Sequence, residues 1–275
     1  MKNNIFGNTH FAFNVWDFNS AKFLLETASD IKRDLIIQTS SGIFEKLPAR
    51  QFRDFIKSYA DELGINVWLN LDHCKDEDLL TEAIGSGWDM VMVDGSHLPI
   101  DENIDFTNRI AEKAHMKDVL VEAEVGQVMG VEDDLVVDKA VLASRDDIKL
   151  FLEKTEIDFI AVAFGNAHGE YKAPPELDYD LVEYTTALSC VPFVVHGGSG
   201  LSADVLKRLI SIEGVKKINI STEVKQAYRE GIINAVRDGA FEKNGFQPVN
   251  VEKYLKKEFN KLVSEKYKLI DNVNG

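Results

Sequence analysis

Eight short apolar runs recur along the 275 residues, and longer amphipathic stretches separate them. The runs are rich in Val, Ile and Phe, and most end in a polar or glycine-bearing tail, which is typical of buried strands bounded by turns. Successive runs begin 23 to 40 residues apart, so every interval has room for a helix. The predicted strands are His10–Trp16, Leu35–Ser40, Val67–Asp72, Met90–Ser96, Val119–Gly126, Phe159–Gly165, Phe193–Ser199 and Lys216–Thr222.

Helical patterns fill the intervals between these runs. Asp54–Leu63 repeats apolar residues at helical spacing, and Ser202–Ile212 opens on a serine at a cap position. Eight strand–helix units predict an α/β protein with a closed parallel barrel and outer helices, the (β/α)8 or TIM barrel. A doubly wound open sheet is the competing fold, but it usually begins with a glycine-rich turn, whereas the first run here ends in Asn14, Val15 and Trp16.

Two segments depart from the regular alternation. The longest interval holds Gln127–Ala143, and a long loop after a barrel strand often covers an active site. Beyond the eighth strand the chain continues through two predicted C-terminal helices, Glu223–Ala240 and Val251–Lys266. Because no linker, low-complexity segment or further repeat interrupts the pattern, we expect residues 1–275 to form a single barrel domain.

The charge balance restricts the partners. Lys and Arg total 31 and Asp and Glu total 46, a net charge of −15, which argues against nucleic acid but allows a small phosphorylated substrate. Cys74 and Cys190 are too few for a disulfide framework and suit a reducing compartment. No apolar stretch approaches the ~20 residues of a membrane span and no signal peptide is visible, so we expect a cytoplasmic protein without a membrane partner.

Three of the six histidines fall at the ends of predicted strands: His73, His168 and His196. The carboxyl ends of barrel strands meet at one face, so these imidazoles can converge on one point there. A single histidine is more often structural, but three at strand ends favour a metal site, and three imidazoles with an open fourth position are typical of catalytic zinc. His10 begins the first strand at the opposite face, and His115 lies in a helical segment.

Carboxylates accompany these histidines. Asp72 directly precedes His73, where it is placed to exchange a proton with a group bound at that histidine. Asp94 ends the fourth run, and Glu122 and Glu124 alternate on the fifth and so share a face. Asp94 and Glu124 either ligate the metal directly or hydrogen-bond the ring N–H of a metal-bound histidine, and the sequence leaves both roles open.

Two loops have the composition of phosphate sites. The seventh strand runs into His-Gly-Gly-Ser-Gly (196–200), and the eighth into Asn-Ile-Ser-Thr (219–222). Successive backbone N–H groups in such turns bind anions, and the loops after strands seven and eight are the usual phosphate position in these barrels. Lys172, shortly after His168, would add a positive charge.

Several ordered motifs together resemble one family, the class II (zinc-dependent) ketose-bisphosphate aldolases, and most of all their tagatose- and fructose-bisphosphate branch. The resemblance runs from about Phe11 to Tyr228. It is carried by AFN (12–14), QTS (38–40), LDH (71–73), DGSH (94–97), EAEVG (122–126), GVEDD (130–134), GNAHG (165–169), HGGSG (196–200) and KINISTE (217–223).

The resemblance implies a role for each matching residue. It implies His73, His168 and His196 as zinc ligands, Asp72 as the acid that protonates the aldehyde oxygen, and Glu132 as the base at C3 of dihydroxyacetone phosphate. A monovalent cation, Na⁺ or K⁺, often accompanies the zinc in such enzymes, near Gly169, Gly197 and Ser199. The implied substrate- and phosphate-binding residues are Asn14, Ser40, Gly169, Lys172, Gly197, Gly198, Ser199, Asn219, Ile220, Ser221 and Thr222.

The implied reaction is the reversible cleavage of a ketose 1,6-bisphosphate, fructose- or tagatose-bisphosphate, to dihydroxyacetone phosphate and glyceraldehyde 3-phosphate through a zinc-stabilised enediolate. A Schiff-base aldolase would need a barrel lysine, and no predicted strand ends in an interior one. We therefore expect a metal-dependent lyase of carbohydrate metabolism that acts in glycolysis, and a homodimer or homotetramer.

Three short segments differ from the usual family pattern: Trp16–Phe18, Ser41–Glu45 and Gln127–Met129. They line the side where the aldehyde half is expected to bind, so two alternatives stay open. The first is a class II-type aldolase for another sugar phosphate, such as a deoxy-keto-gluconate phosphate. The second is a non-catalytic sugar-phosphate-binding subunit, although the intact Asp72, Glu132 and three histidines weigh against it.

Overall fold

A computed structural model describes residue 5 and residues 7–132, 135–137, 142–169, 175–242 and 247–274. Eight parallel strands close into a barrel in the order β1-β11-β10-β8-β5-β4-β3-β2, which confirms the predicted (β/α)8 architecture. Each predicted run supplies one strand, and six of the eight strands end one to four residues before the predicted carboxyl end. The strands are β1 (His10–Asn14), β2 (Leu35–Ser40), β3 (Val67–Cys74), β4 (Met90–Val93), β5 (Leu120–Val125), β8 (Phe159–Val162), β10 (Phe193–Val195) and β11 (Val215–Ile220).

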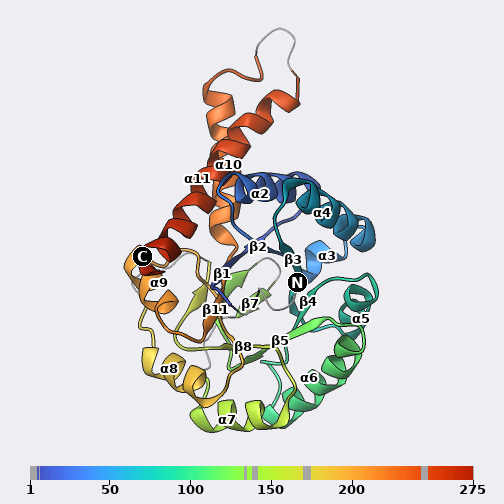
Figure 1. Ribbon diagram of the computed structural model, residues 1–275, viewed down its shortest axis with the longest axis vertical. Coiled ribbons are helices and arrows are strands. Elements are labelled where there is room, and N and C mark those ends of the chain that lie inside the picture. Colours follow the sequence, from blue (N-terminus) through green and yellow to red (C-terminus); the bar gives the residue numbers. More distant parts are fainter. Residues whose placement is uncertain are drawn as a thin grey trace.

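A ring of helices surrounds the barrel, and the short α3 (Ser41–Phe44) follows β2 (Figure 1). Side chains that accept backbone N–H groups fix several helix starts, and Ser202 caps its helix as predicted. The helix expected at Asp54–Leu63 begins earlier, directly after Pro48, and ends at Gly64 in the left-handed conformation. The ring comprises α2 (Phe18–Asp30), α4 (Ala49–Leu63), α5 (Glu77–Gly85), α6 (Ile100–His115), α7 (Arg145–Lys154), α8 (Tyr179–Leu188) and α9 (Ala203–Ile210).

The barrel interior has two layers of different chemistry. Alternate residues of a strand point inward, so the inward sequence of β5 reads Leu120, Glu122, Glu124, with the apolar residue nearest the amino end. The lower layer is an apolar cluster: Ile5, Ala12, Ile36, Trp68, Met90, Leu120, Phe159, Ala161 and Val194. The upper layer is polar and equally buried: Asn14, Gln38, Asn70, Asp72, Glu122, Lys217 and Asn219.

A small second sheet lies above the carboxyl ends of the barrel strands. Its strands β6 (Met129–Glu132), β7 (Leu135–Val137) and β9 (Ala167–His168) are ordered β7-β6-β9. The segment expected as a covering loop thus contains an antiparallel hairpin whose inner strand pairs in parallel with β9. Gly130 makes this pairing possible: its φ is +119°, and a Cβ there would lie 2.2 Å from the carbonyl oxygen of His168.

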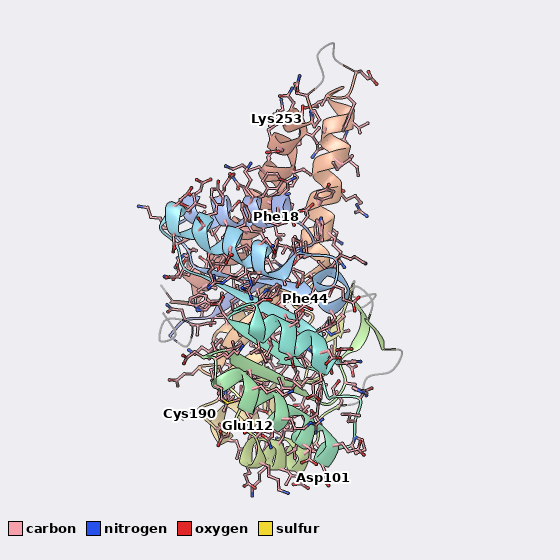
Figure 2. All side chains as sticks on the ribbon, turned by 90° about the vertical axis from the view of Figure 1, so that its right-hand side faces the viewer. Phe18, Phe44, Asp101, Glu112, Cys190 and Lys253 are labelled. Carbon is pink, nitrogen blue, oxygen red and sulfur yellow. The ribbon has the colours of Figure 1, made fainter. Side chains whose placement is uncertain are left out.

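The two predicted C-terminal helices form a pair that extends beyond the barrel. In Figures 1 and 2, α10 (Thr222–Arg237) and α11 (Val249–Asn274) run side by side away from the helix ring, with Lys253 toward the outer end. The helix α11 is longer than predicted, because its second half returns to the barrel and buries Tyr267 and Ile270. Within the described residues no helix combines the length and the apolar character needed to span a bilayer.

Candidate active site

The three predicted histidines meet above the carboxyl end of the barrel. His73 reaches this point because β3 is irregular between Leu71 and Cys74 and because its own φ is +48°, a left-handed conformation that is costly for a non-glycine residue. His168 is held there by β9, and His196 follows β10 directly. Their ring centroids are 4.5 to 5.8 Å apart, and one nitrogen of each lies within 4.8 Å of the other two.

Two carboxylates fix the orientation of these rings. Asp94 Oδ2 lies 3.3 Å from His73 Nδ1, and Glu122 Oε1 lies 2.9 Å from His196 Nε2. The remaining nitrogens, His73 Nε2 and His196 Nδ1, face each other at 2.7 Å. His73 and His196 therefore each place the outer nitrogen on a carboxylate and turn the inner nitrogen to the common centre, the arrangement that orients metal-bound histidines.

The pKa values of the two facing rings are shifted in opposite directions, which favours a proton on His73. Burial disfavours the charged ring, but the nearby Asp72 and Asp94 carboxylates raise the pKa of His73 to about 10. Burial and the charge on His73 lower the pKa of His196 to about 4. A cation placed between these nitrogens replaces the proton, so the charge balance of the cluster suits a metal ion whose binding releases a proton.

Beneath His196 lies an ion pair that the sequence analysis did not single out. Lys217 Nζ is 2.7 Å from Glu122 Oε2, and both side chains are wholly buried. Burial opposes ionisation of Glu122, but the charge of Lys217 and the hydrogen bond with His196 lower its pKa to about 2. The lysine thus keeps charged the carboxylate that orients His196. Lys217 lies midway along β11, not at its end, and its ammonium is bound to Glu122.

Asp94 and Glu124 lie differently toward the histidines. Asp94 contacts the outer nitrogen of His73 and also accepts the hydroxyl of Ser96 at 2.6 Å. Glu124 instead approaches the inner nitrogen of His196, with Oε2 at 3.4 Å from Nδ1. This oxygen has no hydrogen-bond partner among the described residues, and burial, followed by the charge of Asp94, raises the pKa of Glu124 to about 8. A buried oxygen close to His196 and without a hydrogen-bond partner among the described residues fits a cation at this point.

Asp72 is held beside His73 by three amide side chains. Its Oδ2 accepts hydrogen bonds from Gln38 Nε2 at 2.9 Å and Asn14 Nδ2 at 3.4 Å. Its Oδ1 accepts a hydrogen bond from Asn219 Nδ2 at 3.2 Å. Gln38 also donates to Asn14 Oδ1 at 2.7 Å, so the amides brace one another. Ser40 stands next to Asp72 in the register of β2 and β3. The arrangement fixes the carboxylate at the mouth of the barrel.

The two predicted phosphate loops lie side by side and are joined by Ser199. Its Oγ accepts the backbone N–H groups of Ser221 at 3.1 Å and Glu223 at 3.4 Å, at the start of α10. Gly198 donates its N–H to the carbonyl of Asn219 at 3.1 Å. Left-handed backbone at Gly169, Gly197 and Gly200 turns these loops sharply, Ile220 is buried, and Thr222 opens α10. Both loops therefore border the histidine cluster.

The remaining predicted residues fall elsewhere. Lys172 lies outside the described residues, and Glu132 is described only as backbone at the end of β6, two residues from the Gly130–His168 pairing. His115 lies on the outer face of the barrel, where it pairs with Asp158 at 2.8 Å.

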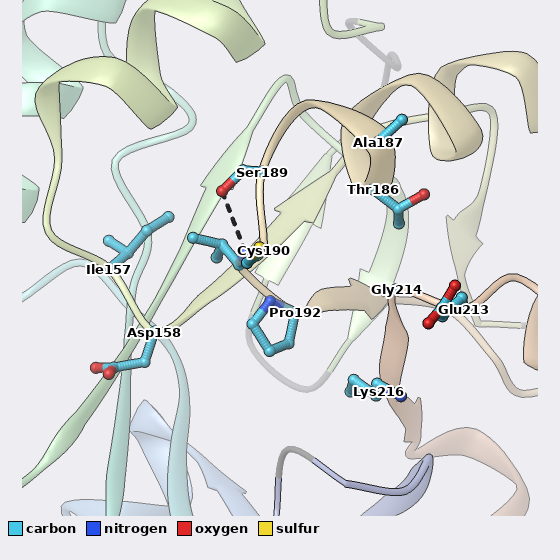
Figure 3. A pocket seen from close by; sticks show the side chains of 11 residues that line it. Ile157, Asp158, Thr186, Ala187, Ser189, Cys190, Pro192, Glu213, Gly214 and Lys216 are labelled. Atoms are coloured by element: carbon cyan, nitrogen blue, oxygen red, sulfur yellow. Dashed lines mark hydrogen bonds between the residues drawn. The ribbon is translucent and has the colours of Figure 1, made fainter.

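A hollow of about 760 Å³ lies at the other end of the barrel, at the amino ends of β8, β10 and β11 (Figure 3). It is lined by residues such as Asp158, Cys190, Glu213 and Lys216, and none of the predicted site residues belongs to its lining. Because barrel enzymes place their chemistry at the carboxyl ends of the strands, we assign no substrate to this hollow.

Comparison with known proteins identifies related sequences. The family model described as "Fructose-bisphosphate aldolase class-II" matches residues 7–275. The sulfofructosephosphate aldolase of Alkalicoccus urumqiensis is 32% identical over 229 residues, which cover 82% of this chain and 79% of that relative.

Solved structures extend the similarity to three dimensions. The YdjI aldolase of Escherichia coli K12 superposes with a TM-score of 0.80 at 26% identity, covering 98% of this chain and 92% of that one. The fructose-bisphosphate aldolase of Campylobacter jejuni superposes with a TM-score of 0.82 at 22% identity, covering 98% and 94%. At that lower identity the second match speaks for the fold alone.

Proposed function

Since the chain belongs to the class II fructose-bisphosphate aldolase family and is therefore a carbon–carbon lyase, we propose that it reversibly cleaves a phosphorylated ketose to dihydroxyacetone phosphate and an aldehyde. The observation that carries this proposal is the convergence of His73, His168 and His196 beside the amide-held carboxylate of Asp72. Fructose- and tagatose-1,6-bisphosphate are the first candidate substrates, and the 32% identity to a sulfofructosephosphate aldolase adds sulfofructose phosphate.

The cluster fits a zinc ion. His73, His168 and His196 would hold it, and Glu124 stands close enough to His196 to approach the same ion. Bound zinc supplies Lewis-acid polarisation of the ketone. The chain supports its ligands through Asp94 and through the Lys217–Glu122 pair, which fix the outer ring nitrogens.

Asp72 is assigned to the aldehyde oxygen. In the cleavage direction its carboxylate takes the proton of the C4 hydroxyl as the C3–C4 bond breaks, and in the synthetic direction it returns that proton. Hydrogen bonds from Gln38, Asn14 and Asn219 fix the carboxylate in place, so the proton moves at a defined point next to His73. Holding a proton donor in position in this way lowers the entropic cost of the step.

Glu132 is assigned to C3 of dihydroxyacetone phosphate, where it removes or returns the carbon-bound proton. Support for this assignment comes from its place at the end of β6, whose backbone pairs with that of His168 through Gly130. A hairpin attached to a metal-ligand strand brings its residues to the same mouth of the barrel.

The phosphate group of the ketose is assigned to the joined loops after β10 and β11. The start of α10 lies there, and its helix dipole favours an anion. Gly169, Gly197 and Ser199 border the same place and are the proposed neighbours of a monovalent cation. The assembly is proposed to be a homodimer or homotetramer.

The test combines elemental analysis with cleavage assays on fructose-bisphosphate, tagatose-bisphosphate, sulfofructose phosphate and a deoxy-keto-gluconate phosphate. We expect chelation to abolish cleavage and zinc to restore it, and we expect borohydride with substrate to leave the enzyme active because no Schiff base forms. Full activity in a preparation shown to be free of metal would contradict the proposal. A protein that binds the sugars but cleaves none of them would be a binding subunit.

The two proton-transfer roles are separable by isotope exchange. Exchange of the C3 proton of dihydroxyacetone phosphate does not involve the aldehyde, so Glu132→Gln should lose it while Asp72→Asn retains it and loses carbon–carbon cleavage. Removing a positioned acid or base typically costs about 10²–10⁴-fold, which both assays resolve. Exchange at the wild-type rate in Glu132→Gln together with its loss in Asp72→Asn would reverse the assignments.

A further inference from the structure

The last helix of the chain brings a buried lysine to the start of α10. The ammonium of Lys266, on α11, lies 2.6 Å from Glu223 Oε2, in the first turn of α10. Lys266 is only 6% exposed, and an ion pair at this depth is screened much less by salt than a surface pair. Lysine is rarely buried to this extent unless it is paired. The contact therefore links the C-terminal helix to the helix that follows the second phosphate loop.

The packing of α11 on the barrel fixes the position of this lysine. The next residue, Tyr267, is buried, and its ring meets the Phe11 ring edge-on with centroids 5.7 Å apart. The Tyr267 hydroxyl donates a hydrogen bond to the backbone carbonyl of Asp34. Val263, one turn before Lys266, is wholly buried, and α11 packs against α2, α9 and α10. Lys266 therefore presents its charge to α10 from a helix that is held on several sides.

The partner of this lysine occupies the end of α10 that is assigned to phosphate. The backbone N–H groups of Ser221 and Glu223 both donate to Ser199 Oγ, at 3.1 and 3.4 Å, which joins the two loops. Ser221 is the N-cap residue, but its side chain makes no capping hydrogen bond. Its Oγ is buried and has no hydrogen-bond partner among the described residues. A buried hydroxyl without a partner at a helix start suits a ligand that accepts hydrogen bonds, as phosphate does.

A carboxylate in this first turn has two opposite effects. The helix dipole favours negative charge at the start of a helix, so the Glu223 carboxylate stabilises α10. The same charge repels a phosphate group bound at that helix start, in a chain whose net charge is already −15. An ammonium 2.6 Å from the carboxylate cancels most of this repulsion, because a close ion pair acts on a more distant charge only as a dipole.

We propose that Lys266 is a positioning residue for the phosphate group of the substrate: it neutralises Glu223 and fixes the first turn of α10 at the phosphate site. The inference rests on the proposed function, since it takes the loops after β10 and β11 as that site. Lys266 acts through Glu223 and does not itself touch the substrate. The C-terminal helix thereby takes part in substrate binding.

Charge predicts the order of phosphate affinity among three variants. The pair adds no net charge near the phosphate in the wild type, −1 in Lys266→Met, +1 in Glu223→Gln and none in the double variant. We expect Lys266→Met to bind phosphate about 3- to 30-fold more weakly, the range for one charge at a helix terminus that is partly buried. Glu223→Gln should bind phosphate at least as tightly as the wild type, and the double variant should be within about 2-fold of it.

The probe is inorganic phosphate, titrated into the zinc-loaded full chain by isothermal calorimetry. The dissociation constant does not depend on how much of the protein is folded, so a partly unfolded variant still gives a valid comparison. Lys256→Met is the matched control, because Lys256 also lies on α11 and pairs with a glutamate, but its partner is Glu26 on α2, at 2.8 Å. This control should keep the wild-type phosphate affinity.

Proton exchange with dihydroxyacetone phosphate separates binding from chemistry. In Lys266→Met the KM for exchange should rise by the same factor as the dissociation constant of inorganic phosphate. The kcat for exchange should stay within about 2-fold of the wild type, since the proposed base Glu132 and the three histidines are unchanged. A general disturbance of the barrel would lower kcat as well.

The outcomes distinguish a failure of this inference from a failure of the proposed function. Wild-type phosphate affinity in Lys266→Met, or no phosphate binding in the wild type, would overturn the inference. Weaker binding in Glu223→Gln and in the double variant would overturn it too, because the pair would then act by packing and not by charge. A zinc-loaded wild type that binds phosphate but neither exchanges the C3 proton nor cleaves a ketose phosphate would instead refute the proposed function.

Discussion

Replacing Lys217 with methionine tests the support beneath the histidine cluster. Methionine has a side chain of similar length, but it removes the charge that lies 2.7 Å from Glu122 Oε2. The side chains of Lys217 and Glu122 are both wholly buried. Removing one partner of a buried ion pair leaves the other uncompensated, and this typically costs about 3–5 kcal/mol. We expect Lys217→Met to lower the free energy of unfolding by that amount.

The same change should weaken metal binding. Without the lysine, Glu122 loses the main interaction that lowers its pKa to about 2, and its burial then favours the protonated form. His196 Nε2, now 2.9 Å from Glu122 Oε1, would no longer face a charged acceptor. Changes of this kind to the partner of a ligand histidine cost about 10–100-fold in metal affinity.

The assay pairs urea unfolding of the metal-free protein with zinc competition against a chromophoric chelator. Lys216→Met is the control, because Lys216 is its neighbour on β11 but lines the hollow of Figure 3. The double variant Lys217→Met, Glu122→Gln removes both charges and should regain most of the stability but not the zinc affinity. Wild-type stability and wild-type zinc affinity in Lys217→Met would refute the reasoning.

Three further predictions follow from contacts described above or from neighbouring ones. His196→Ala should lose most of its zinc at neutral pH while His115→Ala, on the outer face, keeps it, and equal metal content by elemental analysis would contradict the three-histidine site. Gly130→Ala should lower zinc affinity, because its Cβ would lie 2.2 Å from the carbonyl oxygen of His168. The same change should lower the free energy of unfolding by about 1–3 kcal/mol. An unchanged result in the zinc competition assay would contradict the idea that the β6–β7 hairpin positions His168. Glu26 lies on α2, and burial opposes ionisation of its carboxyl group. Hydrogen bonds from Lys256 on α11 and Tyr59 on α4 nevertheless lower its pKa below the unfolded value of 4.5. Its stabilisation is therefore present above pH 4.5 and lost as the pH falls through the lower folded pKa, so Glu26→Gln should flatten the fall of Tm in that window, and an unchanged slope would exclude this role.

The alternation of apolar and amphipathic segments was sufficient to predict the barrel, because eight strand–helix units have few other ways to bury their apolar faces. The two-residue alternation within each strand also predicts which side chains form the upper layer of the barrel interior. Gln38 and Lys217 share the parity of the inward residues Ile36 and Asn219 on their strands. These two residues lie within their strands rather than at the strand ends, but the two-residue period of a strand predicts that their side chains point inward.

Other features of the site have no local sequence signal. Strict alternation that turns Asp72 inward would turn His73 outward, and only the irregular pairing of β3 and the left-handed backbone at His73 bring both to the centre. The pairing of β6 with β9 depends on Gly130 lying against a strand 38 residues later in the sequence, at His168. Such contacts between distant segments depend on the assembled fold.

The Lys217–Glu122 pair has a consequence for how the protein is made. It joins β11 to β5, which are 95 residues apart in sequence and are not neighbours in the barrel. During synthesis the ribosome completes all three histidines before Lys217 emerges, so a nascent chain carries the imidazoles while the carboxylate behind His196 still lacks its counter-charge. For the proposed metal ion we therefore expect high-affinity loading only after β11 closes the barrel, so that acquisition of the ion would follow translation of the last strand.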